Sequence, residues 1–145
     1  MQRLIIPGVV ELTALDMATS ARLFLIGSLP ENETVWGDIE VSVISDDSAA
    51  ITPQQSTRIA EVLAAHAHIL NLAAEFVSIS SGVSLELLQL GLPAFSFYRD
   101  TEHSPLEMTV HFQACVLCPE AGIVVDFEGD IPFGWSDVMD VEDYS

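Results

Sequence analysis

The sequence feature that most constrains the fold is a helical pattern that begins at Thr52-Pro53-Gln54-Gln55. The Thr52 hydroxyl can accept a hydrogen bond from the amide three residues on, and Gln55 can reach back to complete a capping box. Proline is tolerated at the first helical position, which Pro53 would occupy. Apolar residues then follow with three-four spacing, and these are Ile59, Val62, Leu63, His66, Ile69, Leu70, Ala73 and Phe76 or Val77. The pattern predicts a helix of about 25 residues, either continuous, kinked or broken. Its other face is rich in alanine and poor in charge, so we expect it to be buried on most sides.

Strand patterns flank this helical segment on both sides. Residues 22–29 and 35–45 both fit strands, and in the second of them Ile39, Val41 and Val43 alternate with polar residues. Apolar and polar residues also alternate over residues 106–112 and 123–128, and residues 94–98 are an apolar run. Residues 9–15 fit either a strand or a short helix. The turn-like segment from Cys118 to Gly122 predicts that the runs at 106–112 and 123–128 pair as a hairpin. A shorter helix is expected over residues 84–90, because Gly91 can supply a left-handed stop and Pro93 follows it.

The order of these elements predicts one α+β domain over residues 1–145, in which an antiparallel sheet is packed by one long and one shorter helix. The last part of the chain, residues 130–145, carries five acids and no base. This acidic tail either packs through its apolar residues or is mobile. Those apolar residues are Ile131, Phe133, Trp135 and Val138.

The charge balance is strongly acidic. The chain has 22 acidic residues against four arginines, and its formal net charge is −18. Such a field repels nucleic-acid phosphates and anionic membranes, whereas it attracts a basic protein. The acidity alternatively serves only solubility or adaptation to a salty cytosol. We therefore expect a basic protein partner and no direct binding to nucleic acid or membrane.

The candidate chemical groups do not assemble into a recognisable active site. Cys115 and Cys118 have the spacing of half a zinc site, but the second half is missing, and packed thiols are expected. His66 and His68 do not share one helix face. Asp126, Glu128 and Asp130 alternate and can in principle hold calcium or magnesium, although a solvated strand face explains them better. The sequence predicts no enzyme activity, no metal and no cofactor.

The cysteine content and the N-terminal segment bear on the compartment. Two cysteines are too few for a disulfide framework, which favours a reducing compartment. The apolar N-terminal stretch is interrupted by Pro7, Gly8, Glu11 and Asp16 before a signal-peptide core forms, and no segment has the length of a membrane span. These features predict a cytoplasmic location.

Three short segments resemble a family of small, acidic, uncharacterised bacterial proteins. They are the Gly-Asp-Ile-Glu-Val run at residues 37–41, the Thr-Pro-Gln-Gln helix start, and the Pro-Glu-Ala-Gly-Ile turn at residues 119–123. Asp137 matches the terminal aspartate of that family, whereas Leu117, Cys118, Pro119 and Glu120 replace its tryptophan-aspartate-glutamate-histidine turn. Members of the family are similar to immunity proteins that neutralise polymorphic toxins. The resemblance implies toxin binding and no catalytic residue.

These observations lead to the hypothesis of an immunity-type inhibitor that binds and neutralises a basic toxin without catalysis. Exposed aromatics are common anchors of such interfaces, although core packing is the more common role of any one aromatic, and the candidates are Trp36, Phe133, Trp135 and Tyr144. The predicted partner-binding residues are Glu40, Asp126, Glu128, Trp135, Asp137, Asp140, Glu142 and Asp143. One alternative is an acidic DNA mimic that blocks a nucleic-acid-binding enzyme. The other is a non-catalytic assembly subunit that forms a homo-oligomer through its charge-poor helix.

Overall fold

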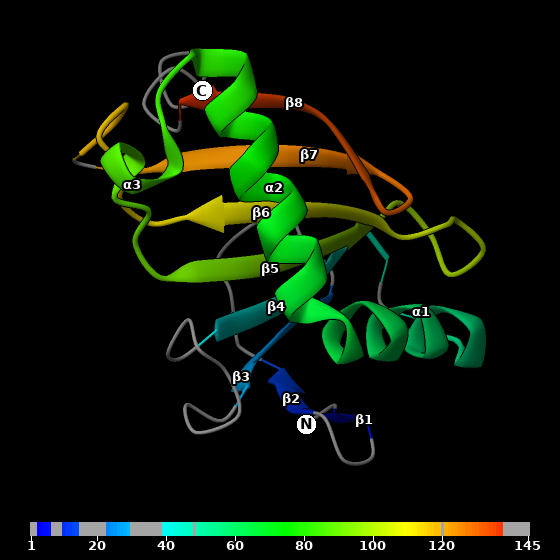
Figure 1. Cartoon of the computed structure of the whole chain (residues 1–145). Coiled ribbons are helices and arrows are strands. Elements are labelled where there is room, and N and C mark those ends of the chain that lie inside the picture. Colours follow the sequence, from blue (N-terminus) through cyan, green and yellow to red (C-terminus); the bar gives the residue numbers. More distant parts are fainter. Residues whose placement is uncertain are drawn as a thin grey trace.

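The computed structural model describes residues 3–6, 10–14, 23–29, 39–47, 49–119 and 121–137. Over these residues the chain is an α+β structure in which the helices lie on one face of a single sheet (Figure 1). The helices are α1 (Pro53–Ala64), α2 (His66–Ser81) and α3 (Leu85–Leu88). The strands are β1 (Arg3–Ile6), β2 (Val10–Ala14), β3 (Leu23–Leu29), β4 (Ile39–Ser45), β5 (Pro93–Arg99), β6 (Glu107–Phe112), β7 (Ile123–Glu128) and β8 (Ile131–Asp137).

The strands lie side by side in the order of the sequence, from β1 to β8. Each neighbouring pair is antiparallel except β4 and β5, which run parallel with Val41 opposite Phe95. The prediction of an antiparallel sheet is therefore wrong at this pair. Parallel neighbours need a long crossover, and the helical segment between β4 and β5 supplies it. The predicted hairpin of residues 106–112 and 123–128 is confirmed as the β6–β7 pair.

The long helical pattern folds as two helices, α1 and α2, which are bent by 72° at a break. The break lies at Ala65, whose backbone N–H contacts the carbonyl oxygens of Glu61 and Val62. The outer side of α2 is exposed at Ala67, Asn71 and Ile79. The expectation of burial on most sides is wrong, because the helices pack against one face of the sheet and leave their alanine-rich side outward.

The predicted second helix is shorter than residues 84–90 and ends by a different residue. Gln89, with φ of 52°, adopts the left-handed conformation at the C-terminus of α3. Gly91 is required for another reason, since a Cβ there would lie 2.9 Å from the backbone nitrogen of Ala114. A close approach between two backbone segments, and not helix termination, explains this glycine.

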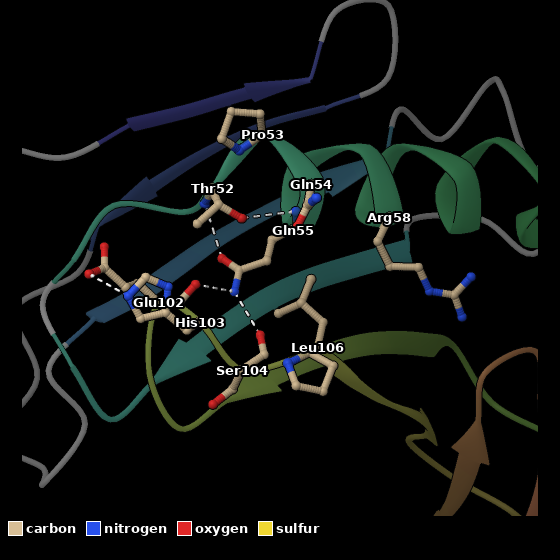
Figure 2. Close-up of a pocket in the computed structure, with 10 residues that line it drawn as sticks. Thr52, Pro53, Gln54, Gln55, Arg58, Glu102, His103, Ser104 and Leu106 are labelled. Atoms are coloured by element: carbon tan, nitrogen blue, oxygen red, sulfur yellow. Dashed lines mark hydrogen bonds and ion pairs between the residues drawn. The ribbon is translucent and has the colours of Figure 1, made fainter.

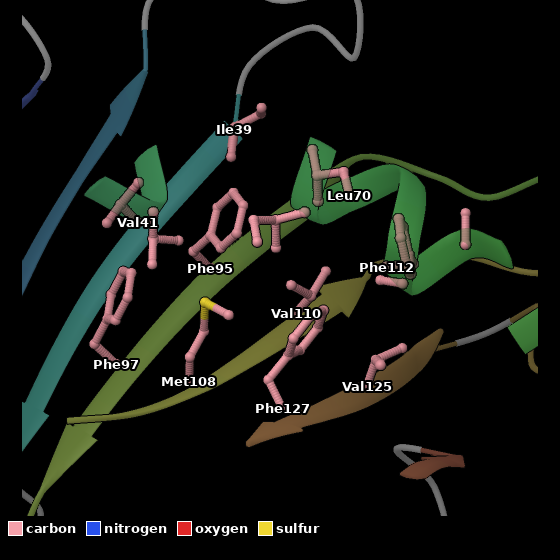
Figure 3. Packing of buried hydrophobic residues seen from close by; sticks show 14 of the residues in the cluster. Ile39, Val41, Leu70, Phe95, Phe97, Met108, Val110, Phe112, Val125 and Phe127 are labelled. Atoms are coloured by element: carbon pink, nitrogen blue, oxygen red, sulfur yellow. The ribbon is translucent and has the colours of Figure 1, made fainter. Parts of the chain in front are cut away.

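The hydrophobic core fills the space between the helices and the sheet (Figure 3). Phe95, Phe97 and Phe112 project from neighbouring strands and are fully buried. Cys115 and Cys118 belong to the same core, and the chain turns between them, with the Cys118 N–H donating to the Cys115 carbonyl at 3.0 Å. Both thiols therefore pack as apolar groups.

No single described helix is long and apolar enough to cross a bilayer, and α1 and α2 reach that length and composition only as a bent pair. Their apolar residues, including Ile59, Leu63 and Leu70, are buried in the core described above.

Candidate partner-binding groove

The described members of the predicted partner-binding set divide between the two faces of the sheet. Glu40, Asp126 and Glu128 share the face away from the core, where β5 and β6 place their two strands about 14 Å apart. Trp135 is partly buried and packs against the core. Asp137 ends β8 and is half-buried. Asp140, Glu142 and Asp143 lie outside the described residues, as do Trp36, Val138 and Tyr144.

A different concave surface lies beside the first helix. One hollow of about 610 Å³ separates the N-terminal part of α1 from the loop that precedes β6 (Figure 2). A second hollow of about 530 Å³ extends from there toward the β7–β8 turn. Arg58, Pro105 and Leu106 line both hollows. We call the two together the α1 groove.

The capping box predicted from the sequence positions the start of α1 at this groove. Gln55 donates its backbone N–H to the Thr52 hydroxyl at 3.2 Å, and its side-chain oxygen accepts from the Thr52 N–H at 3.0 Å. The Gln55 side-chain nitrogen also donates to the carbonyl oxygens of Glu102 at 3.1 Å and Ser104 at 2.9 Å. One buried amide thus fixes both the helix start and the facing loop (Figure 2).

Arg99 holds the residues that form the groove in place. It ends β5, its side chain is 0% exposed, and its guanidinium donates to the Ser45 hydroxyl at 2.7 Å and the Gln55 side-chain oxygen at 2.6 Å. It also donates to the Asp47 carboxylate at 3.2 Å and to the carbonyl oxygens of Ala49 and Ala50. These bonds connect the ends of the parallel strands to α1, so the groove rests on a fixed frame.

Asp47 is the acidic partner in this frame. Burial raises its pKa, but hydrogen bonds from the Glu102 and Ala49 N–H groups and the charge of Arg99 together outweigh burial and lower it. Asp47 therefore remains a carboxylate at neutral pH, as the buried guanidinium requires.

The lining of the second hollow combines an apolar floor with an acidic rim. Met108 and Phe127 are buried at its base, whereas Phe133 is 62% exposed. Glu107 and Glu128 also line this hollow and are exposed. Their alternation with the core-facing Met108 and Phe127 places them on the outer face of the sheet, at the edge of the hollow. Glu102 lines the first hollow. An exposed aromatic next to carboxylates is suited to a segment that carries both apolar and basic side chains.

Arg58 is the one arginine among the residues that line the groove, and its charge is already paired. Its Nη2 lies 2.8 Å from the Asp130 Oδ1 and donates to the Gly129 carbonyl at 2.9 Å. Because Arg99 is buried, these two arginines present no unpaired cation on the described surface.

Tyr98 lies at the same ends of the parallel strands. Its hydroxyl is 2.7 Å from the Asp100 carboxylate and 2.6 Å from the Asp46 carboxylate. Hydrogen bonding to Asp100, and then to Asp46, raises the pKa of the phenol above its ordinary value. Tyr98 is therefore a neutral hydroxyl at physiological pH and not a phenolate nucleophile.

No three His, Cys, Asp or Glu side chains among the described residues come together in an arrangement that can hold a metal ion. His111 contacts the Ala121 carbonyl through Nε2 at 2.9 Å, and His66 contacts the Leu63 carbonyl through Nδ1 at 2.8 Å. Both histidines have local structural contacts.

Comparison of the chain with known protein families, curated proteins and solved structures finds no match. The α1 groove is therefore interpreted from its own residues.

Sequence reasoning identified Phe133, Asp126 and Glu128, which line the second hollow, but missed three residues that line both hollows, Arg58, Pro105 and Leu106. These residues come from a helix and a loop that the sequence separates by more than forty positions. The available signal was the scarcity of basic residues, since each of the four arginines on an otherwise acidic chain is a candidate for a specific ion pair.

Proposed function

We propose that this chain is a non-catalytic binding protein that captures a basic protein, in the manner of a cytoplasmic immunity protein that neutralises a toxin. The observation that carries the proposal is the α1 groove, where the exposed Phe133 lies beside an apolar floor and an acidic rim. Phe133 is the apolar anchor, and Glu107 and Glu128 are the carboxylates that meet the partner's basic side chains.

The charge distribution supports a basic occupant. With a formal net charge of −18, the chain attracts a cationic domain over a distance and raises the rate of encounter. Arg58 is neutralised by Asp130 and Arg99 is buried, so neither arginine repels such a partner. Desolvation of Phe133 and the groove floor then supplies short-range affinity.

The polar groups of the groove support binding over catalysis. Gln55 and Arg99 are engaged in holding α1 and its facing loop. His103 is exposed, and its Nε2 lies 3.4 Å from the Glu102 carboxylate, a contact that is too long for a strong hydrogen bond. These groups are suited to shaping a surface and not to moving a proton.

A pull-down from the source organism tests this function with three tagged proteins, the wild type, Phe133→Ser and Ile79→Ser. Ile79 is a matched control, because it is 82% exposed and lies on the outer side of α2. Both substitutions remove exposed apolar groups and should change stability by no more than about 0.5 kcal/mol.

We expect one basic protein to be retained at low salt by the wild type and Ile79→Ser, with roughly tenfold weaker retention by Phe133→Ser. The retained protein should be toxic when expressed alone, and co-expression of the wild type should relieve that toxicity. Equal retention by all three proteins would contradict the proposed site. A captured nucleic-acid-binding enzyme would instead support DNA mimicry, and a single self-associated species in a solution mass measurement would support an assembly subunit.

A further inference from the structure

The turn between β7 and β8 already holds a guanidinium group. The carbonyl of Gly129 accepts a hydrogen bond from Nη2 of Arg58 at 2.9 Å, and the carboxylate oxygen of Asp130 lies 2.8 Å from the same nitrogen in an ion pair. Arg58 belongs to α1 and lies 71 positions from Gly129 in the sequence, so the contact spans the second hollow of the α1 groove. The fold thus presents an acceptor pair, one carbonyl and one carboxylate, to a cation that reaches it from across the groove.

Exposure at the turn leaves this acceptor pair accessible. The Asp130 side chain is 61% exposed and that of Arg58 is 28% exposed. Gly129 has φ of +63°, and no heavy atom lies within 4 Å of the position that a Cβ would occupy. The turn therefore has open space on that side, where a second side chain can approach.

The internal ion pair is weak enough to be exchanged. Ion pairs between exposed side chains contribute only about 0–1 kcal/mol to stability. A partner that brings its own arginine, together with apolar contacts to Phe133, can replace Arg58 at little cost. When Arg58 moves away, Glu107, Glu128 and Asp130 remain at the rim, and the positive charge that offset part of their negative charge is removed.

We propose that the Gly129–Asp130 turn is a guanidinium-binding site, which Arg58 occupies within the chain until an arginine of the partner replaces it. Arg58 is then an internal competitor that lowers the affinity for the partner and restricts binding to partners with a suitably placed arginine. Both contacts are made by the single Nη2 nitrogen. Lysine is a poorer replacement because an ammonium is more strongly hydrated than a guanidinium and therefore loses more on leaving water. The partner part of this proposal rests on the proposed function, whereas the site itself does not.

The first experiment tests the site alone with a small probe. Ethylguanidinium is added to Arg58→Ala, and the backbone amides of Gly129 and Asp130 are followed by NMR. We expect saturable shifts with ethylguanidinium, and shifts at least threefold smaller with ethylammonium at equal ionic strength. The double variant Arg58→Ala/Asp130→Asn should lose the response. Equal shifts for the two cations, or an unchanged response in the double variant, would overturn the proposal.

The second experiment tests the competition with a hexa-arginine peptide at fixed low salt. Arg58→Ala should bind the peptide about 3- to 10-fold more tightly than the wild type does, because the competitor is gone. Removal of one positive charge also strengthens the general attraction, and Asn71→Asp on the exposed side of α2 controls for that effect with the same change in net charge. Equal tightening in both variants would contradict the role of Arg58. Failure of every variant to bind the peptide, with the ethylguanidinium response intact, would count against the proposed function and leave the site standing.

Discussion

Arg99 shows at the scale of one residue how a buried charge can organise this fold. The guanidinium is fully buried and has its hydrogen-bond donors directed at Ser45, Asp47, Gln55 and two backbone carbonyls. Among the described buried side chains, no nitrogen or oxygen atom lacks a partner. A buried ion pair is stabilising only while all its partners remain, since loss of one member leaves the others desolvated.

Arg99→Ala is therefore expected to lower the free energy of unfolding by about 3–5 kcal/mol. Arg99→Lys should recover less than half of that loss, because one ammonium cannot reach all of the acceptors that surround the edge of the planar guanidinium. Urea unfolding monitored by circular dichroism measures both. Arg58→Ala is the comparison, and a loss for Arg99→Ala no larger than for this partly exposed arginine would contradict the assigned role.

Two aspartates provide a second prediction because their pKa values shift in opposite directions. Burial raises the pKa of Asp126, so the folded protein holds that proton to higher pH than the unfolded chain does. Ionisation of Asp126 then lowers stability as the pH rises from its unfolded pKa through the raised folded value. Asp47 has a lowered pKa, so its contribution is present above the unfolded value and is lost as the pH falls through the folded value.

We expect Asp126→Asn to be more stable than the wild type at pH 7 and to lose that advantage toward pH 3. Asp47→Asn should be less stable than the wild type at pH 7, with the difference shrinking toward pH 3. Unfolding curves collected at both pH values check the pair. The same sign of effect in both variants at pH 7 would contradict these assignments.

At the scale of elements, Gly122 in the β6–β7 connection can be compared with Gly82 at the end of α2. Gly122 has φ of +81°, and a Cβ there would lie 1.8 Å from the Phe112 carbonyl oxygen. Gly82 has φ of +76° at the end of α2, but no atom lies within 4 Å of its would-be Cβ. The two positions share the left-handed conformation and differ only in the space around them.

Gly82→Ala is expected to cost about 1 kcal/mol from the backbone conformation alone. Gly122→Ala should cost at least about 3 kcal/mol, because the β6 backbone must also move. Thermal unfolding of the two variants distinguishes these cases. Equal losses would mean that the connection adapts without disturbing the β6–β7 pair.

Elements were more predictable from the sequence than their arrangement. The capping box at Thr52, the strand at 123–128 and the β6–β7 hairpin are confirmed, because each depends on local hydrogen bonding or on alternation over a few residues. The parallel β4–β5 pair was missed, since alternation identifies a strand but not the direction of its neighbour. The sequence pattern allows a continuous, a kinked or a broken helix, and the structure has a break at Ala65.

The candidate site was less predictable for a related reason. Strand alternation predicts the sheet face that Glu40 and Asp126 share, but it does not predict the two strands that lie between them. The α1 groove joins Arg58, Leu106 and Phe133, which no local pattern connects. Only the packing of α1 beside the β7–β8 turn makes the exposed Phe133 part of a concave surface.

At the scale of the whole molecule, the net charge of −18 acts on stability as well as on binding. Like charges repel one another in the compact state, and salt screens this repulsion over a Debye length that falls from about 30 Å at 0.01 M to about 3 Å at 1 M. We expect the melting temperature to rise by several degrees between low salt and about 0.5 M sodium chloride. A melting temperature that falls over this range would show that the described ion pairs outweigh the repulsion.

Binding of a basic partner at the α1 groove can be measured by titrating the hexa-arginine peptide into the isotopically labelled wild type and mapping the amide shifts by NMR. We expect saturable shifts concentrated at residues 106–108 and 129–133, which weaken as salt is added. Shifts centred on α3, or spread evenly over the acidic surface without saturation, would contradict binding at the groove.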